Sequence, residues 1–67
     1  MNWISTKDKL PDKDAACLVV RKRYVEILVW NNTHECWDDS DGDDFCCNLD
    51  DVKYWILLSD LPPIPND

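Results

Sequence analysis

The chain has 67 residues and carries 14 acidic against 7 basic side chains, a net charge of −7. This length allows one domain, residues 1–67, with a small core. The charge opposes contact with nucleic-acid phosphates or with an anionic membrane surface, so we expect neither as a partner.

The first third of the chain predicts a helical turn and two strands. Ser5 and Asp8 have the spacing of a capping box, and Pro11 ends any helix that begins there, so we expect one helical turn over residues 5–10. Residues 15–20 are apolar at every position and predict a strand. Residues 24–30 are rich in β-branched and aromatic side chains and predict the best-defined strand of the chain.

Asn31 and Asn32 predict a two-residue hairpin turn, because asparagine tolerates positive φ. The return strand is then residues 33–37, with Trp30 opposite Thr33. Alternation predicts one face with Tyr24, Glu26, Leu28, Trp30 and Trp37, and the other with Val25, Ile27, Val29, His34 and Cys36. We expect the strand over residues 24–30 to be covered on both faces.

The second half of the chain predicts a loop over residues 38–44, an apolar anchor over 45–47, a helical turn over 48–51 and a strand over 52–58. Prolines require residues 61–65 to be extended. The expected fold class is α+β or mainly β. We expect a single domain with a three- to four-stranded antiparallel sheet and one or two helical turns.

Metal-binding chemistry has little support in the acidic loop or in the cysteines. With Gly42 at the sixth position of a calcium loop, Trp37 and Asn48 occupy positions that require carboxylates. His34, Cys36, Cys46 and Cys47 leave a structural zinc site open as an alternative, although the C-x₂-C spacing is absent. We therefore expect no metal and no cofactor.

Enzymatic chemistry is not expected. His34 is the single histidine, and no third group is in place to orient it toward a thiol nucleophile. No secretion signal is visible, so we expect a reducing cytoplasm in which the four cysteines stay free thiols.

Binding is the expected mode of action. An aromatic residue followed by carboxylates suits contact with a basic protein, and the candidate contact residues are Trp37, Asp38, Asp39, Asp41, Asp43 and Asp44. The alternative is a small-ligand binder that sequesters a signalling nucleotide, with phosphate contacts from Arg21, Lys22 and Arg23 and a stacking ring from Trp30. It stays open that the tryptophans are core and the acids merely solvated. A homo-oligomer is possible, because strand edges and a small core both favour pairing.

The chain also resembles a family known as domain of unknown function 551. The carrying residues are Trp3-Ile4-Ser5, Lys7-Asp8 and Leu10-Pro11 at the start, Trp37-Asp38-Asp39 and Asp43-Asp44-Phe45-Cys46 in the middle, and Val52, Trp55 and Leu61-Pro62-Pro63 at the end. Tyr54 departs from the family, which often has histidine there, and Leu57-Leu58-Ser59-Asp60 lengthens the approach to the prolines. The resemblance implies a bacteriophage or prophage setting and a small β-rich fold, and it implies no reaction. Together with the acidic charge, it favours a non-enzymatic accessory protein that binds a host protein in the host cytoplasm, such as a component of an antiviral defence system.

Overall fold

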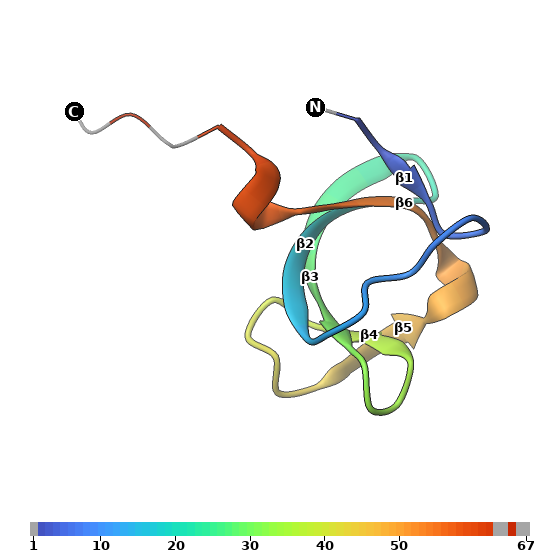
Figure 1. The fold of residues 1–67 in the computed structure, drawn as a ribbon. Coiled ribbons are helices and arrows are strands. Elements are labelled where there is room, and N and C mark those ends of the chain that lie inside the picture. The colour runs from blue at the N-terminus through green and yellow to red at the C-terminus, as the bar shows by residue number, and fades with distance from the viewer. Residues whose placement is uncertain (1, 63–64, 66–67) are drawn as a thin grey trace.

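Six antiparallel strands form one sheet in the computed structural model, which describes residues 2–62 and 65 (Figure 1). The strands are β1 (Ile4–Ser5), β2 (Ala15–Arg21), β3 (Tyr24–Asn31), β4 (Cys36–Asp38), β5 (Phe45–Asn48) and β6 (Val52–Leu57). Their order across the sheet is β1-β6-β2-β3-β4-β5, so β6 returns to lie between β1 and β2. Two 3₁₀ turns, η1 (Leu49–Asp51) and η2 (Leu58–Asp60), flank β6. Figure 1 shows that the sheet is strongly curved.

The predicted three- to four-stranded sheet is wrong, because the sheet has six strands, and the described residues contain no α-helix. The turn predicted over residues 48–51 is present as the short 3₁₀ turn η1. Residues 5–10 do not form the expected helical turn. Ser5 instead pairs with Tyr54 as part of β1, and its carbonyl accepts the N–H groups of Asp8 and Lys9 at 3.0 and 3.1 Å in a simple turn. Residues 45–47, predicted as an anchor, belong to β5. Strands of two to four residues are too short for alternation to identify them.

The hairpin between β3 and β4 also differs from the prediction. Trp30 lies opposite Trp37 and Asn31 opposite Cys36, so residues 32–35 form the loop and the two-residue turn is wrong. Glu35 adopts a φ of 52° at the end of this loop. The register moves by an even number of residues, and Trp30 and Trp37 therefore share a face as predicted.

The core lies on the inner face of the curved sheet. It consists of Cys17, Val19, Leu28, Trp30, Trp37, Cys47, Val52 and Trp55, all of them buried. Trp30 and Trp37 pack edge to face, with ring centroids 4.9 Å apart. The Nε1–H group of Trp55 donates to the Lys9 carbonyl at 2.9 Å, which ties the segment between β1 and β2 across the core.

Strand β3 is covered on its inner face only. Leu28 and Trp30 are buried, whereas Val25 and Ile27 on the opposite face are 53% and 46% exposed. The expectation that β3 is covered on both faces is therefore wrong. Of the segment 61–65, which was predicted to be extended, residues 63 and 64 lie outside the described residues.

The core tryptophans differ in the hydrogen bonding of their indole N–H groups. We therefore expect a Trp→Phe substitution to cost different amounts of folding stability at different positions. The Trp55 N–H has a partner in Lys9, whereas the buried Trp37 N–H has none among the described residues. Trp55→Phe removes a hydrogen bond that contributes about 0.5–1.5 kcal/mol, and Trp37→Phe removes an unsatisfied donor. In urea unfolding followed by circular dichroism, we expect Trp55→Phe to lower the free energy of unfolding by about 1 kcal/mol more than Trp37→Phe. Trp3→Phe, at an exposed ring, is the control, and equal losses at Trp37 and Trp55 would contradict this account.

Candidate functional site

The face of the sheet that points away from the core carries an apolar surface in which every residue except Ile56, which is buried, is at least partly exposed. Residues directly opposite each other on paired strands share a face, so the register defines this surface. One row across the strands contains Tyr54, Val20 and Val25, the next contains Ile56, Leu18 and Ile27, and the third contains Ala16, Val29, Asp38 and Phe45. We refer to these residues as the outer face. The largest apolar patch of a monomeric protein often has a function, which makes this face a candidate contact surface.

The β2–β3 hairpin places positive charge at one end of the outer face. Its two turn residues, Lys22 and Arg23, form the basic turn, and both are exposed. Lys22 adopts a φ of 58°, which a tight two-residue turn requires. Val20 and Val25, which pair directly below this turn, form the first apolar row of the outer face.

The loop between β4 and β5 places negative charge at the other end. Residues 39–44 form this acidic loop, which hydrogen bonds of its own hold in place. The Asp39 N–H donates to the Asp44 carbonyl at 2.8 Å, and the Gly42 N–H donates to the Asp39 carbonyl at 2.9 Å. The Asp39 carboxylate also accepts the Asp43 N–H at 3.3 Å. The loop is therefore an ordered turn.

Gly42 shows where the tip of the acidic loop lies. Its φ of +78° suits glycine, and a Cβ built on it would stand 3.9 Å from Cγ2 of Val29. Because Val29 belongs to the outer face, the loop tip lies beside that face. Figure 1 shows the β2–β3 turn and the β4–β5 loop at opposite ends of the long β2–β3 ladder.

A shallow hollow lies where the acidic loop meets strand β4. It is lined by Asn31, His34, Glu35, Cys36, Asp38, Asp43, Phe45 and Asn48. The Asp38 carboxylate accepts hydrogen bonds from the Asn31 amide at 3.1 Å and from the Cys36 thiol at 3.8 Å. Phe45, directly opposite Asp38, is 61% exposed and supplies an aromatic surface beside these carboxylates.

The structure separates the predicted partner-binding residues into two groups. Asp38, Asp39, Asp41, Asp43 and Asp44 lie together at the acidic end of the outer face, whereas Trp37 lies fully buried in the core. The exposed aromatic residue of this region is Phe45, which was predicted to be part of an apolar anchor. Side-chain alternation could not reveal this, because Phe45 faces outward opposite Asp38 only through an irregularity in the β4–β5 pairing between Trp37 and Asp38.

The residues predicted to bind a nucleotide do not form one pocket. Arg21 pairs with Tyr24 at one end of the β2–β3 ladder, and Trp30 pairs with Ala15 at the other. The Arg21 Nε–H donates to the Glu26 carboxylate at 2.7 Å, and its guanidinium lies 5.5 Å from the centroid of the Tyr24 ring. Trp30 is buried and donates its indole N–H to the Asn32 side chain at 3.0 Å. Lys22 and Arg23 remain exposed.

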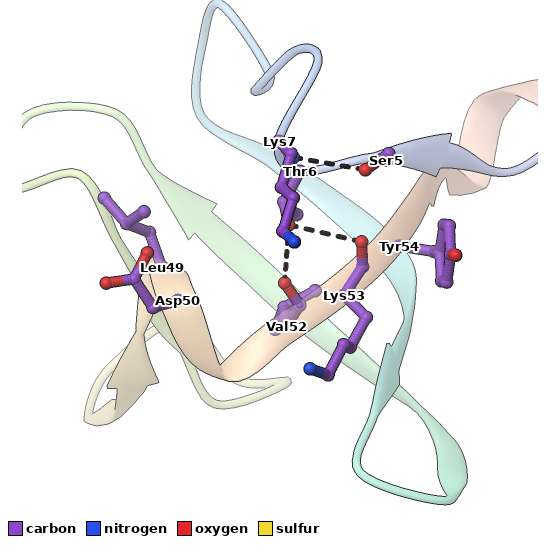
Figure 2. A pocket seen from close by; sticks show the side chains of 8 residues that line it. All are labelled: Ser5, Thr6, Lys7, Leu49, Asp50, Val52, Lys53 and Tyr54. Carbon is purple, nitrogen blue, oxygen red and sulfur yellow. Dashed lines mark hydrogen bonds between the residues drawn. The ribbon is translucent and has the colours of Figure 1, made fainter.

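A second hollow lies between β6 and the turn that follows β1, and it contains positive charge (Figure 2). Its lining is Ser5, Thr6, Lys7, Leu49, Asp50, Val52, Lys53 and Tyr54. The Thr6 hydroxyl holds the turn to β6 by donating to the Val52 carbonyl at 2.7 Å. Figure 2 shows Lys7 and Lys53 between Asp50 on one side and Tyr54 on the other. No described carboxylate forms an ion pair with either lysine.

The cysteines do not form a reactive or metal-binding cluster in the described part of the chain. All four are free thiols, and no group of three potential metal ligands comes together among residues 2–62 and 65. His34 lies in the exposed loop before β4, and not on a strand beside Cys36 as predicted. Burial raises the pKa of Cys17 to about 11. Burial, and to a smaller extent the neighbouring Cys46, raises the pKa of Cys47 to about 12.

Comparisons with protein-family models, curated proteins and solved structures found no match to this chain. The resemblance to a phage-associated family therefore stays a prediction. None of the helical segments that the structure describes is long and apolar enough to cross a membrane.

The buried thiols predict a loss of stability at alkaline pH. The pKa of Cys17 rises from 9.0 to about 11 on folding, so between these values the unfolded chain has released a proton that the folded chain retains. Stability is therefore complete below pH 9 and falls above it, by up to about 1.4 kcal/mol per pH unit for each such thiol. We expect Cys17→Ala to show a shallower decline than the parent protein when urea unfolding is measured from neutral to alkaline pH. Identical slopes would show that Cys17 does not contribute to the decline.

Proposed function

We propose that the protein acts by binding another protein through its outer face, and that it catalyses no reaction itself. The observation that supports this most strongly is the meeting of three features on one face. An apolar surface extends from Tyr54 on β6 over β2 and β3, the exposed ring of Phe45 lies at one end of it, and the ordered acidic loop lies beside Val29. Apolar anchors next to charged rims are typical of protein interfaces.

The charge at the rim defines the chemistry of the partner. Asp41, Asp43 and Asp44 are exposed at the acidic end, so a suitable partner presents lysines or arginines next to apolar side chains. The apolar contact then contributes most of the affinity, and the carboxylates contribute to the association rate and to orientation. The resemblance noted above would make this partner a host protein in the cytoplasm, such as a component of antiviral defence.

The state of the thiols also favours binding over catalysis. Cys36 and His34 line the same hollow, which makes Cys36 the thiol best placed for a histidine to activate. Burial, and then the negative charge of Asp38, raise the pKa of Cys36. A nucleophilic thiol requires the opposite shift, because the thiolate is the reactive form.

The cationic hollow favours a second candidate function, the binding of a small anion such as a nucleotide. Two lysines without ion-pair partners among the described carboxylates lie in the hollow, beside the 45% exposed ring of Tyr54. Phosphate groups bind to such ammonium groups, and an aromatic ring can stack on a base. This candidate replaces the contacts predicted for Arg21 and Trp30 with Lys7, Lys53 and Tyr54.

Neutralising the acidic loop tests the main proposal. We expect the triple variant Asp41→Asn, Asp43→Asn, Asp44→Asn to bind a lysine-rich synthetic peptide with central leucines about tenfold more weakly, a change of about 1.4 kcal/mol. Fluorescence anisotropy of the labelled peptide measures this. The control, Asp8→Asn with Asp12→Asn and Asp60→Asn, alters the net charge equally at exposed positions outside the acidic loop. Equal weakening by both triples would show that only net charge matters and would contradict the proposal.

Removing the two lysines tests the second candidate. We expect calorimetry to detect binding of adenosine monophosphate, and Lys7→Gln with Lys53→Gln to weaken it about tenfold, because surface phosphate contacts are mainly electrostatic. Tyr54→Ala should weaken adenosine monophosphate and leave inorganic phosphate unaffected. Lys13→Gln with Lys22→Gln is the matched control. Absence of binding in the parent protein, or equal loss in the control, would rule out this site.

A further inference from the structure

We propose that the outer face binds a second copy of this chain, in a two-fold dimer whose axis lies in the interface and runs across the strands. This inference rests on the proposed function, because it takes the outer face as the contact surface and names one partner for it. The partner has the required chemistry: it presents apolar side chains and positive charge on the same face.

The charges of the outer face are separated along the direction of the strands. The basic turn lies beyond Val20 and Val25, and the acidic loop lies beside Val29 at the opposite end. From Arg23 to Val29 the chain advances six residues, which is about 20 Å in a strand. The separation is larger than the Debye length of about 8 Å at physiological salt, so the two ends act as distinct charged sites.

This polarity selects one of the two symmetric ways to pack the face against itself. A two-fold axis along the strands brings the basic turns together and the acidic loops together. An axis across the strands brings each basic turn against the acidic loop of the other copy. The second arrangement forms two identical contacts between Lys22 and Arg23 on one chain and Asp41, Asp43 and Asp44 on the other, as a two-fold interface requires.

The central rows of the outer face supply the apolar part of the interface. Val25, Ile27 and Tyr54 are the most exposed of these residues, and half-buried Leu18 and Val20 lie between them. A patch of about 20 by 15 Å is smaller than the roughly 800 Å² per partner of a standard interface. The face is also convex, because the core lies inside the curve (Figure 1). Two convex faces meet at their centres and diverge toward their ends. We therefore expect a weak dimer, in which the charged ends attract each other over a distance and the interaction depends on salt.

Sedimentation velocity over a range of protein and salt concentrations tests the dimer. We expect a concentration-dependent monomer–dimer equilibrium whose dissociation constant rises about tenfold when the Debye length falls from about 10 Å to about 3 Å. Ile27→Thr, which keeps a β-branched side chain, should weaken the dimer, whereas Thr33→Ser in the exposed β3–β4 loop should not. A parent protein that stays monomeric throughout would overturn the proposal.

Charge reversal tests the direction of the axis. One variant carries Lys22→Asp with Arg23→Glu, and the other carries Asp41→Lys with Asp43→Lys; aspartate tolerates the positive φ at position 22. We expect each variant alone to be monomeric. A chain that carries all four substitutions should dimerise with itself but not with the parent protein, because an axis across the strands joins opposite charges in the first pair and like charges in the second. Near-ultraviolet circular dichroism confirms that each variant is folded. If the chain with all four substitutions stays monomeric, or pairs with the parent protein as an axis along the strands would allow, this arrangement is wrong.

The two proposals fail in different ways. A monomeric parent protein that still binds the lysine-rich peptide through the acidic loop would overturn the dimer and leave the proposed function standing. The parent protein could instead dimerise through the outer face and bind the peptide no better than the variant in which Asp41, Asp43 and Asp44 are changed to Asn. That result would overturn the binding of a basic partner and leave self-association as the role of the outer face. Dimers that are insensitive to Ile27→Thr and to salt would indicate pairing of sheet edges, which overturns the outer-face interface.

Discussion

The edge-to-face contact between Trp30 and Trp37 determines where the candidate contact surface lies. The two rings occupy opposite positions on β3 and β4 and are both buried, with centroids 4.9 Å apart. Side chains alternate along a strand, so Trp37 pointing inward requires Asp38 to point outward. The irregularity that follows then places Phe45 opposite Asp38 on the same outer face. One aromatic contact in the core thus determines which residues at the acidic end meet solvent.

This contact leaves a buried donor without a partner. The Trp30 indole N–H reaches the Asn32 side chain at the end of the strand, and the Trp55 N–H reaches a backbone carbonyl. The Trp37 N–H has no partner among the described residues. An unsatisfied donor in a core costs stability, so the large apolar area of the ring must outweigh that cost. In a 67-residue domain few other side chains could bury as much surface.

Much of the sheet could be predicted from local sequence, and its edges could not. Residues 15–20 were expected as a strand because every position is apolar, and residues 24–30 because they are rich in β-branched and aromatic side chains; both are strands in the structure. The short strands β1, β4 and β5 depend on pairing partners far along the chain, which a window of a few residues does not reveal. The β3–β4 register was mispredicted because Asn31 and Asn32 suggest a tight turn. Asn31 instead accepts the His34 N–H, and the Asn32 N–H donates to Asp14.

The candidate site was predictable in composition but not in arrangement. The aspartates were expected to share a surface, and they do lie together at one end of the outer face. Periodicity could not tell that the accompanying aromatic residue is Phe45 and not Trp37, because the difference depends on one irregularity between adjacent residues. Even register shifts preserve faces, which is why the shared face of Trp30 and Trp37 was correct although their partners were not.

The acidic composition opposes the non-specific association that the exposed apolar face would otherwise favour. A small domain that leaves Val25, Ile27, Tyr54 and Phe45 exposed tends to associate without specificity. A net charge of −7 opposes such association in every orientation. Only a partner that places positive charge against the acidic loop removes part of this repulsion. In the proposed dimer, the charge therefore opposes other modes of association and selects the orientation in which the outer face is covered.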